Sequence, residues 1–219
     1  MHRDGTPVRI WEHEGVSTPT PAAPATSGPL DSIPRPLRPP LLLTAAMWGE
    51  EVVDTVMDGR LDRYGIRPRD LAGLEGIVFS PFLHAGFGHL IANTVPFVVL
   101  GTAIALGGVR RFLTVTGITA VIGGLGTWLI GPERTVHIGA SGLVFGYLSY
   151  LVSRGIFARK LSYLLGGVVV LAVYGGALWG LLPTPGISWQ GHLFGAVGGI
   201  AAASTLHGSS PDRRLATDG

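Results

Sequence analysis

Cysteine is absent from this chain of 219 residues, and only 14% of the residues are charged. The absence of cysteine excludes disulfide bonds and thiol chemistry. A soluble domain usually carries about 25% charged residues, so the scarcity of charge argues against an ordinary soluble protein. Acidic residues are almost missing from the second part of the chain, where Glu133 is the only one between Gly76 and Pro211. The composition therefore points to a membrane.

The chain contains long runs of uncharged residues. Three runs contain no Asp, Glu, Lys or Arg, namely Phe112–Gly131, Thr135–Ser153 and Leu161–Ser210. Each is about as long as, or longer than, the roughly 20 apolar residues that a helix needs to cross a bilayer. The sequence therefore predicts an all-α, multi-pass membrane protein that has the lipid bilayer as a partner.

The net charge of +2 and the sequence pI of about 9.3 would also suit a nucleic-acid-binding protein. The basic residues, however, are scattered and flank the apolar runs. This placement is typical of membrane topology, because Lys and Arg collect in short cytoplasmic loops. We therefore expect no nucleic-acid partner.

Six spans are expected between two tails. Residues 1–38 are rich in Pro, Thr, Ser and Ala and predict a disordered cytoplasmic tail, and residues 208–219 predict a second one. The transmembrane domain, residues 39–207, contains these expected spans: Leu41–Met57, His89–Leu106, Phe112–Gly131, Ser141–Ser153, Leu161–Leu182 and Gln190–Leu206. The mixed-charge segment Asp58–Ser80 predicts a structured first loop.

Basic residues fall at alternate connections between these spans. They are Arg110 and Arg111, then Arg154, Arg159 and Lys160, then Arg213 and Arg214. By the positive-inside rule these ends are cytoplasmic. The four arginines of the first loop oppose the pattern, but three Asp and a Glu accompany them. We predict an integral protein of the plasma (inner) membrane with both termini in the cytoplasm, so that spans two, four and six start from the outer side.

Polar residues stand at the start of the same three spans. Span two opens with His89 and Asn93, span four with Ser141, and span six with His192. A polar group within a span is costly and is by default a functional hypothesis. A serine hydroxyl is a poor nucleophile unless a base takes its proton, and histidine is the usual base. Because these spans contain no Asp or Glu, the sequence predicts a Ser–His dyad of Ser141 and His192 rather than a triad.

Hydrolysis by such a dyad requires stabilisation of an oxyanion. Ser141 begins a helix, where free N–H groups and the helix dipole favour a developing anion. His89 and Asn93 lie four residues apart on one helical face and can supply two further donors. We therefore expect the oxyanion donors to be His89, Asn93 and the backbone N–H of Ser141.

The length of span four predicts a buried site. Ser141 to Ser153 is 13 residues, or roughly 20 Å of helix, in a hydrocarbon core about 30 Å thick. If Arg154 marks the inner boundary, Ser141 lies on the order of 10 Å below the outer surface. An extension of this helix to Phe157 would weaken the estimate without reversing it. The segment Gly131–Ala140 would then descend into the membrane beside a water-filled cavity.

Small residues predict that spans four and six pack closely. Gly142 and Gly146 lie four apart on span four, and Gly195 and Gly199 lie four apart on span six. Small residues at this spacing allow two membrane helices to approach each other. This packing would hold Ser141 and His192 together.

Three motifs resemble those of the rhomboid family of intramembrane serine proteases. They are Phe82-Leu-His84-Ala-Gly-Phe-Gly-His89-Leu-Ile-Ala-Asn93, then Gly139-Ala-Ser141-Gly142, then His192-x-x-Gly195-x-x-x-Gly199. The resemblance covers about Leu41–Leu206. It implies a six-transmembrane-helix rhomboid-like bundle and a serine endopeptidase, without metal or cofactor, that cleaves transmembrane segments of membrane proteins. It also implies that Ser141 is the nucleophile and His192 the base.

Two positions depart from the family pattern. The residue four after the serine, often Tyr in the family, is Phe145, which can stack on His192 but has no hydroxyl to donate. The Trp-Arg pair often found in the first loop is replaced by Glu75-Gly76. These departures concern loop anchoring and substrate gating more than the chemistry.

Two other functions fit the sequence less well than a protease. A non-catalytic rhomboid-like protein that binds or escorts membrane helices would lack the serine or the histidine, and both are present. A zinc metalloprotease is disfavoured because there is no H-E-x-x-H motif. For His84 and His137 a structural role in the loops is favoured over a catalytic one.

Overall fold

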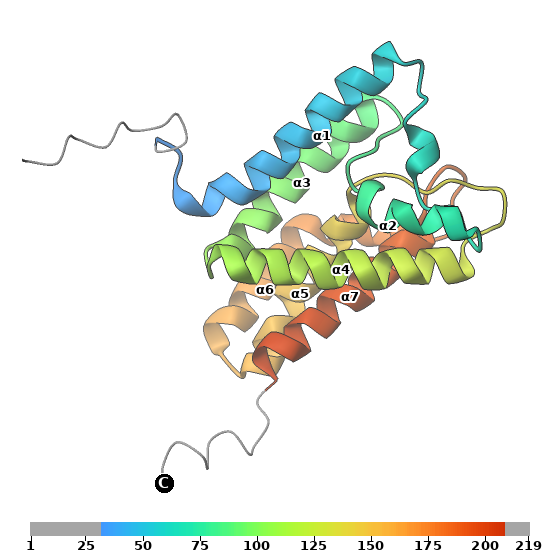
Figure 1. Ribbon diagram of the computed structural model, residues 1–219. Helices are drawn as coiled ribbons and strands as arrows, with labels where there is room; N and C mark the ends of the chain where they lie inside the picture. Colours follow the sequence, from blue (N-terminus) through green and yellow to red (C-terminus); the bar gives the residue numbers. More distant parts are fainter. Residues whose placement is uncertain (1–31, 209–219) are drawn as a thin grey trace, which may run out of the picture.

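The computed structural model describes residues 32–208, and the parts of the two expected tails at 1–31 and 209–219 lie outside the described residues (Figure 1). The described chain is helical, with one isolated backbone bridge, between Ile66 and His137, and no strand. In chain order its helices are η1 (Arg35–Leu37), α1 (Arg38–Val56), η2 (Asp62–Tyr64), η3 (Leu71–Glu75), α2 (Gly76–Phe79), α3 (Phe87–Ala105), α4 (Val109–Ile130), α5 (Ser141–Ala158), α6 (Leu161–Tyr174), η4 (Gly175–Leu181) and α7 (Trp189–His207). The predicted all-α fold is confirmed.

A helix occupies each of the six expected spans. Helices α3, α4 and the α6–η4 segment are long and apolar enough to cross a membrane by themselves. Helix α1 begins at Arg38 rather than Leu41, and the turn η1 precedes it within the stretch expected to be disordered. Three such helices within residues 32–208 support an integral membrane protein, and the count of six spans stays a prediction.

Helix α5 is longer than expected. It continues past the predicted boundary at Ser153 and ends at Ala158, which makes it 18 residues, or about 27 Å, long. Arg154 does not end the helix, and its guanidinium lies 4.6 Å from the centroid of the Tyr163 ring on α6. A helix of this length nearly crosses the hydrocarbon core. The predicted end of this span at Ser153 was therefore wrong, and the depth of Ser141 in the membrane stays a prediction.

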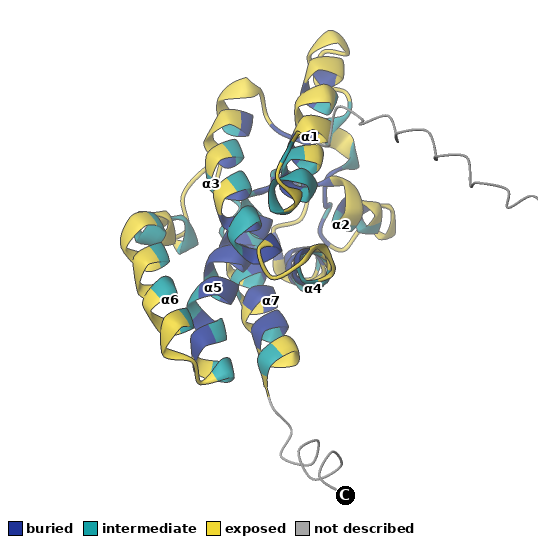
Figure 2. Ribbon diagram, turned by 90° about the vertical axis from the view of Figure 1, so that its left-hand side faces the viewer, coloured by how far each residue is buried: buried dark blue, intermediate teal, exposed yellow. Residues whose placement is uncertain are grey.

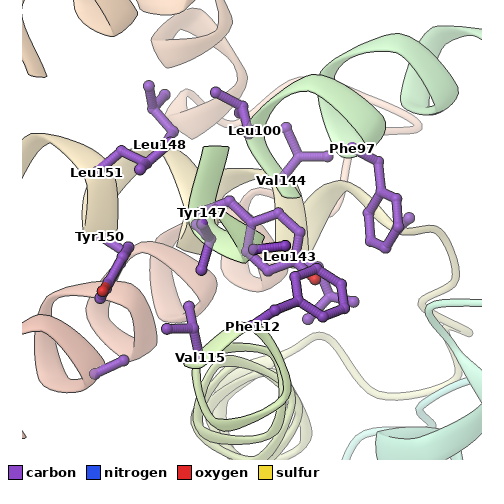
Figure 3. Packing of buried hydrophobic residues seen from close by; sticks show 14 of the residues in the cluster. Phe97, Leu100, Phe112, Val115, Leu143, Val144, Tyr147, Leu148, Tyr150 and Leu151 are labelled. Atoms are coloured by element: carbon purple, nitrogen blue, oxygen red, sulfur yellow. The ribbon is translucent and has the colours of Figure 1, made fainter. Parts of the chain in front are cut away.

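Helix α5 lies at the centre of the bundle and packs against α3, α4, α6 and α7. Its Tyr147 is fully buried and lies 5.4 Å from Phe97 and 5.8 Å from Phe112, measured between ring centroids (Figure 3). The Tyr147 hydroxyl is satisfied by the Thr116 hydroxyl on α4 at 2.8 Å. This cluster fixes the position of the helix that begins at Ser141.

Helix α6 lies at the edge of the bundle and is mostly exposed (Figure 2). Only Gly167 of this helix is buried, while Leu165, Val168 and Val169 are more than half exposed. An apolar helix with so little protein contact is typical of a lipid-facing surface.

The first loop is structured, with the short helices η2, η3 and α2. The Trp128 indole N–H of α4 donates to the Asp70 carbonyl oxygen of this loop at 2.8 Å. The Arg69 guanidinium contacts Glu133, just after α4, at 3.1 Å. Gly76 packs so tightly that a Cβ there would overlap the backbone of Ile66. The loop is therefore anchored without the Trp-Arg pair of the family pattern.

Candidate active site

Helices α5 and α7 approach each other closely, as their glycine spacing predicts. A Cβ on Gly195 would overlap the carbonyl oxygen of Gly142, and one on Gly199 would overlap that of Gly146. Only glycine allows this separation of the two backbones. The contact runs along the same helical faces that carry Ser141 and His192.

Ser141 and His192 form a hydrogen bond. Ser141 is the first residue of α5, His192 lies in the first turn of α7, and Oγ is 2.8 Å from Nε2. The His192 side chain is buried. The residue that precedes Ser141, Ala140, provides no side-chain cap, so N–H groups of the first turn of α5 stay free to bind an anion.

The backbone of Gly180 determines which nitrogen of His192 carries the proton. The Gly180 carbonyl oxygen lies 2.8 Å from Nδ1 of His192. A carbonyl oxygen can only accept, so Nδ1 carries the hydrogen and Nε2 is left as an acceptor. The Ser141 hydroxyl therefore donates to Nε2, which is the arrangement in which an imidazole can take its proton.

The His192 ring is held on both sides. The Phe145 ring stacks on it with 4.2 Å between the centroids and 8° between the planes. Gly180 of η4 lies beside both rings, since a Cβ there would be 3.0 Å from Nδ1 of His192 and 3.1 Å from Cζ of Phe145. Stacking and the carbonyl bond together restrict the ring to one orientation.

His89 and Asn93 face the same cavity as Ser141 and His192. The cavity measures about 940 Å³ and is lined by all four residues. The Ala85 N–H donates to Nδ1 of His89 at 3.4 Å, so Nε2 of His89 carries a hydrogen. One amide N–H of Asn93 donates to the His89 carbonyl oxygen at 2.9 Å, which leaves its second N–H for another acceptor.

Gly139 is required beside His89 for two reasons. Its φ of +112° lies in a region that side chains rarely adopt. A Cβ there would also lie 2.6 Å from Cε1 and 2.8 Å from Nε2 of the His89 ring. The glycine therefore lets the imidazole approach the start of α5.

His84 joins two loops. Its Nδ1 donates to the Phe82 carbonyl oxygen at 3.1 Å, and its Nε2 accepts the Ala140 N–H at 3.3 Å. Burial lowers the pKa of His84 to about 4, so the ring is neutral at physiological pH. The contact with Ala140 fixes the backbone directly before Ser141.

His137 lies in a continuous chain of hydrogen bonds that ends at α7. The Thr135 hydroxyl donates to the Pro132 carbonyl oxygen at 2.7 Å, so it accepts from Nε2–H of His137 at 2.9 Å. Nδ1 of His137 then accepts from the Ser188 hydroxyl at 2.6 Å. Ser188 in turn caps α7, because its oxygen accepts the Gly191 N–H at 3.3 Å.

Two of these contacts were missed from the sequence. Ser188 precedes the helix that carries His192, and a serine before an apolar run is a helix-start signal that would have indicated a cap. The Gly180 contact is made by a backbone carbonyl, so no residue type in the sequence indicates it.

The fold and the site define a helical membrane protein with a serine hydrogen-bonded to a histidine at one end of its bundle. A sequence model of the Rhomboid domain matches residues 72–209, and the chain therefore belongs to the rhomboid family. The resemblance read from the three motifs is confirmed.

Some relatives of the chain are uncharacterized proteins, and others are named as rhomboid proteases. The uncharacterized protein Rv1337 of Mycobacterium tuberculosis (strain ATCC 25618 / H37Rv) is 48% identical over 183 residues, which cover 80% of this chain and 75% of the relative. The putative rhomboid protease YdcA of Bacillus subtilis (strain 168) is 31% identical over 119 residues, or 54% of this chain and 60% of the relative. The rhomboid protease GluP of the same organism is 30% identical over 125 residues, or 57% of this chain and 24% of the relative.

Proposed function

We propose that the protein is an intramembrane serine endopeptidase that cleaves transmembrane segments of other membrane proteins. The observation that carries this proposal is the 2.8 Å hydrogen bond between Oγ of Ser141 and Nε2 of His192. Membership of the rhomboid family supports it, since that membership suggests an intramembrane protease. A protein that only binds membrane helices would not need this bond.

The proposed reaction follows the general course of serine proteases. His192 takes the proton as Ser141 Oγ attacks the scissile carbonyl, and the proton then passes to the leaving amine. Water, deprotonated by the same imidazole, hydrolyses the acyl-enzyme. The Gly180 carbonyl orients the ring in the role that an Asp has in a triad.

The developing oxyanion would be stabilised by three donors. Nε2–H of His89 and the second N–H of Asn93 face the cavity, and the backbone N–H of Ser141 begins α5. Removing one such donor typically costs about 2.7–4 kcal/mol of transition-state stabilisation. No step requires a metal or a cofactor.

We also propose the topology of the protein in the membrane. Helices α1, α3, α4, α5, α6–η4 and α7 would be six spans, with residues 39–207 as the transmembrane domain and both termini in the cytoplasm. His89, Ser141 and His192 all lie near the N-terminal ends of their helices, which would face the outer side of the plasma membrane. The cavity would then admit water from that side.

The test uses a serine-reactive fluorophosphonate probe and a model transmembrane substrate in liposomes. The unmodified protein should be labelled and should cleave the substrate, and Ser141→Ala and His192→Ala should do neither. Ser153→Ala is the matched control, because that serine lies on the same helix and donates only to the Ser149 carbonyl oxygen. Unchanged cleavage by Ser141→Ala would refute the protease. Binding of transmembrane segments without cleavage or labelling by the unmodified protein would favour the non-catalytic alternative.

A further inference from the structure

Basic residues gather at the end of the bundle opposite Ser141. Four helices begin or end there, and each contributes one residue to what we term the basic cluster: Arg111 of α4, Arg154 of α5, Lys160 just before α6, and His207 at the end of α7. The charges of Arg111, Arg154 and Lys160 lie near enough to the His207 ring to act on it. Residues from four separate helices therefore meet at one place.

Tyr163 of α6 lies in the middle of the basic cluster. The Arg154 guanidinium is 4.6 Å and the Lys160 ammonium 5.7 Å from the centroid of its ring. The His207 ring is 6.0 Å from the same ring and is held by a 2.9 Å hydrogen bond between its Nε2 and the Tyr150 hydroxyl. These contacts place the charges of Arg154 and Lys160 beside one aromatic ring.

No carboxylate balances this charge within the described residues. The one acidic residue after Gly76 in that part of the chain is Glu133, which pairs with Arg69 beside the first loop. Among residues 32–208, none of the three cationic side chains of the basic cluster forms a salt bridge. Nε of Arg154 is buried and donates to no acceptor. Because no carboxylate neutralises these cations, the cluster is suited to an external anion.

Two helices also direct their N-terminal ends at this region. Helix α4 starts at Val109, two residues before Arg111, and α6 starts at Leu161, directly after Lys160. Neither helix has a side-chain cap. Their free N–H groups and dipoles add to the attraction for an anion that the side chains already create.

We infer that the basic cluster binds the phosphate group of an anionic membrane lipid. A lipid fits better than a free ion because the exposed apolar residues of α6 begin directly after Lys160, with Leu161, Leu165 and Val168 available to acyl chains. Basic sites between membrane helices are suited to such head groups. Arginine supplies the paired donors that match phosphate oxygens.

The inference is tested on the full-length protein by native mass spectrometry from mixed micelles of phosphatidylcholine and phosphatidylglycerol. The unmodified protein should retain phosphatidylglycerol in preference to phosphatidylcholine. Arg154→Gln and Lys160→Gln should each weaken this retention about tenfold, the size expected when a hydrogen bond to a charged group is lost. Lys160 is exposed, so its variant reports on binding even if Arg154→Gln unfolds the protein.

Arg110→Gln is the matched control, because Arg110 is exposed, adjoins Arg111 and carries the same charge at the same end of the bundle. The retention of phosphatidylglycerol by this variant should stay within about twofold of that by the unmodified protein. Equal losses in Arg110→Gln and Lys160→Gln would overturn the site, because they would show only diffuse attraction. Displacement of the lipid by inorganic phosphate would overturn the assignment to a lipid. Lipid retention is measured without proteolysis, so this inference and the protease proposal can fail independently.

Discussion

The Phe145 ring lies flat on the His192 ring, with 4.2 Å between their centroids. Such a stack contributes about 0.5–1.5 kcal/mol beyond its buried area. Phe145→Leu should therefore lower kcat about 2- to 12-fold, because the imidazole is less well oriented. Phe145→Tyr should keep the activity, since the ring is retained. Cleavage rates of a model transmembrane substrate check both, and equal rates for the Leu and Tyr variants would show that the stack is irrelevant.

A side chain at position 180 should impair catalysis. A Cβ there would lie 3.0 Å from Nδ1 of His192, so Gly180→Ala must displace the ring by a few tenths of an ångström. Catalysis depends on such distances, and we expect kcat to fall about tenfold while the melting temperature changes little. Gly176→Ala is the control, because a Cβ at this neighbouring position in η4 meets nothing within 4 Å. Equal activities of the two variants would contradict the orienting role of Gly180.

The sequence predicted the helices well, because long apolar runs separated by charged or Pro-containing turns leave few alternatives in a membrane. The end of α5 was expected too early, at Ser153, because the long side chain of Arg154 can remain in a helix while its charged group packs on Tyr163. The contact between Ser141 and His192 could be predicted because two unusual polar residues begin alternate spans, and their catalytic role stays a prediction. The Gly180 contact could not be found, since every residue has a carbonyl and only the folded chain decides which one meets Nδ1.

The hydrogen bonds of Ser188 should position α7. Ser188→Ala removes the cap of this helix, which typically costs about 1 kcal/mol, and breaks the link to His137. Because His192 lies in the first turn of α7, we expect kcat to fall several-fold with a nearly unchanged KM. Ser188→Thr keeps the hydroxyl and should restore both kcat and the melting temperature. A rise in KM alone would instead indicate that Ser188 contacts the substrate.

The glycine contact between α5 and α7 should control stability. A valine at Gly199 would overlap the Gly146 carbonyl oxygen and the Ser149 side chain. Overpacking of this kind costs about 1–3 kcal/mol, so Gly199→Val should lower the melting temperature in detergent. Gly117→Val is the control, because Gly117 is exposed on α4 and a Cβ there meets nothing within 4 Å. Equal melting temperatures for the two variants would contradict the close packing.

Asp62 in the first loop should make stability depend on pH. Burial, together with the nearby carboxylates of Asp54 and Glu51, raises the pKa of Asp62 from 3.8 to about 6. The folded state therefore holds the proton more tightly than the unfolded state, so the free energy of unfolding is higher below pH 3.8 and falls as the pH rises through 6. Asp62→Asn cannot ionise and should lose the part of this dependence that Asp62 contributes. Melting temperatures measured across this pH range check the prediction. The variant should exceed the unmodified protein most at neutral pH, and the two should converge under acidic conditions. Parallel curves would show that Asp62 is not responsible.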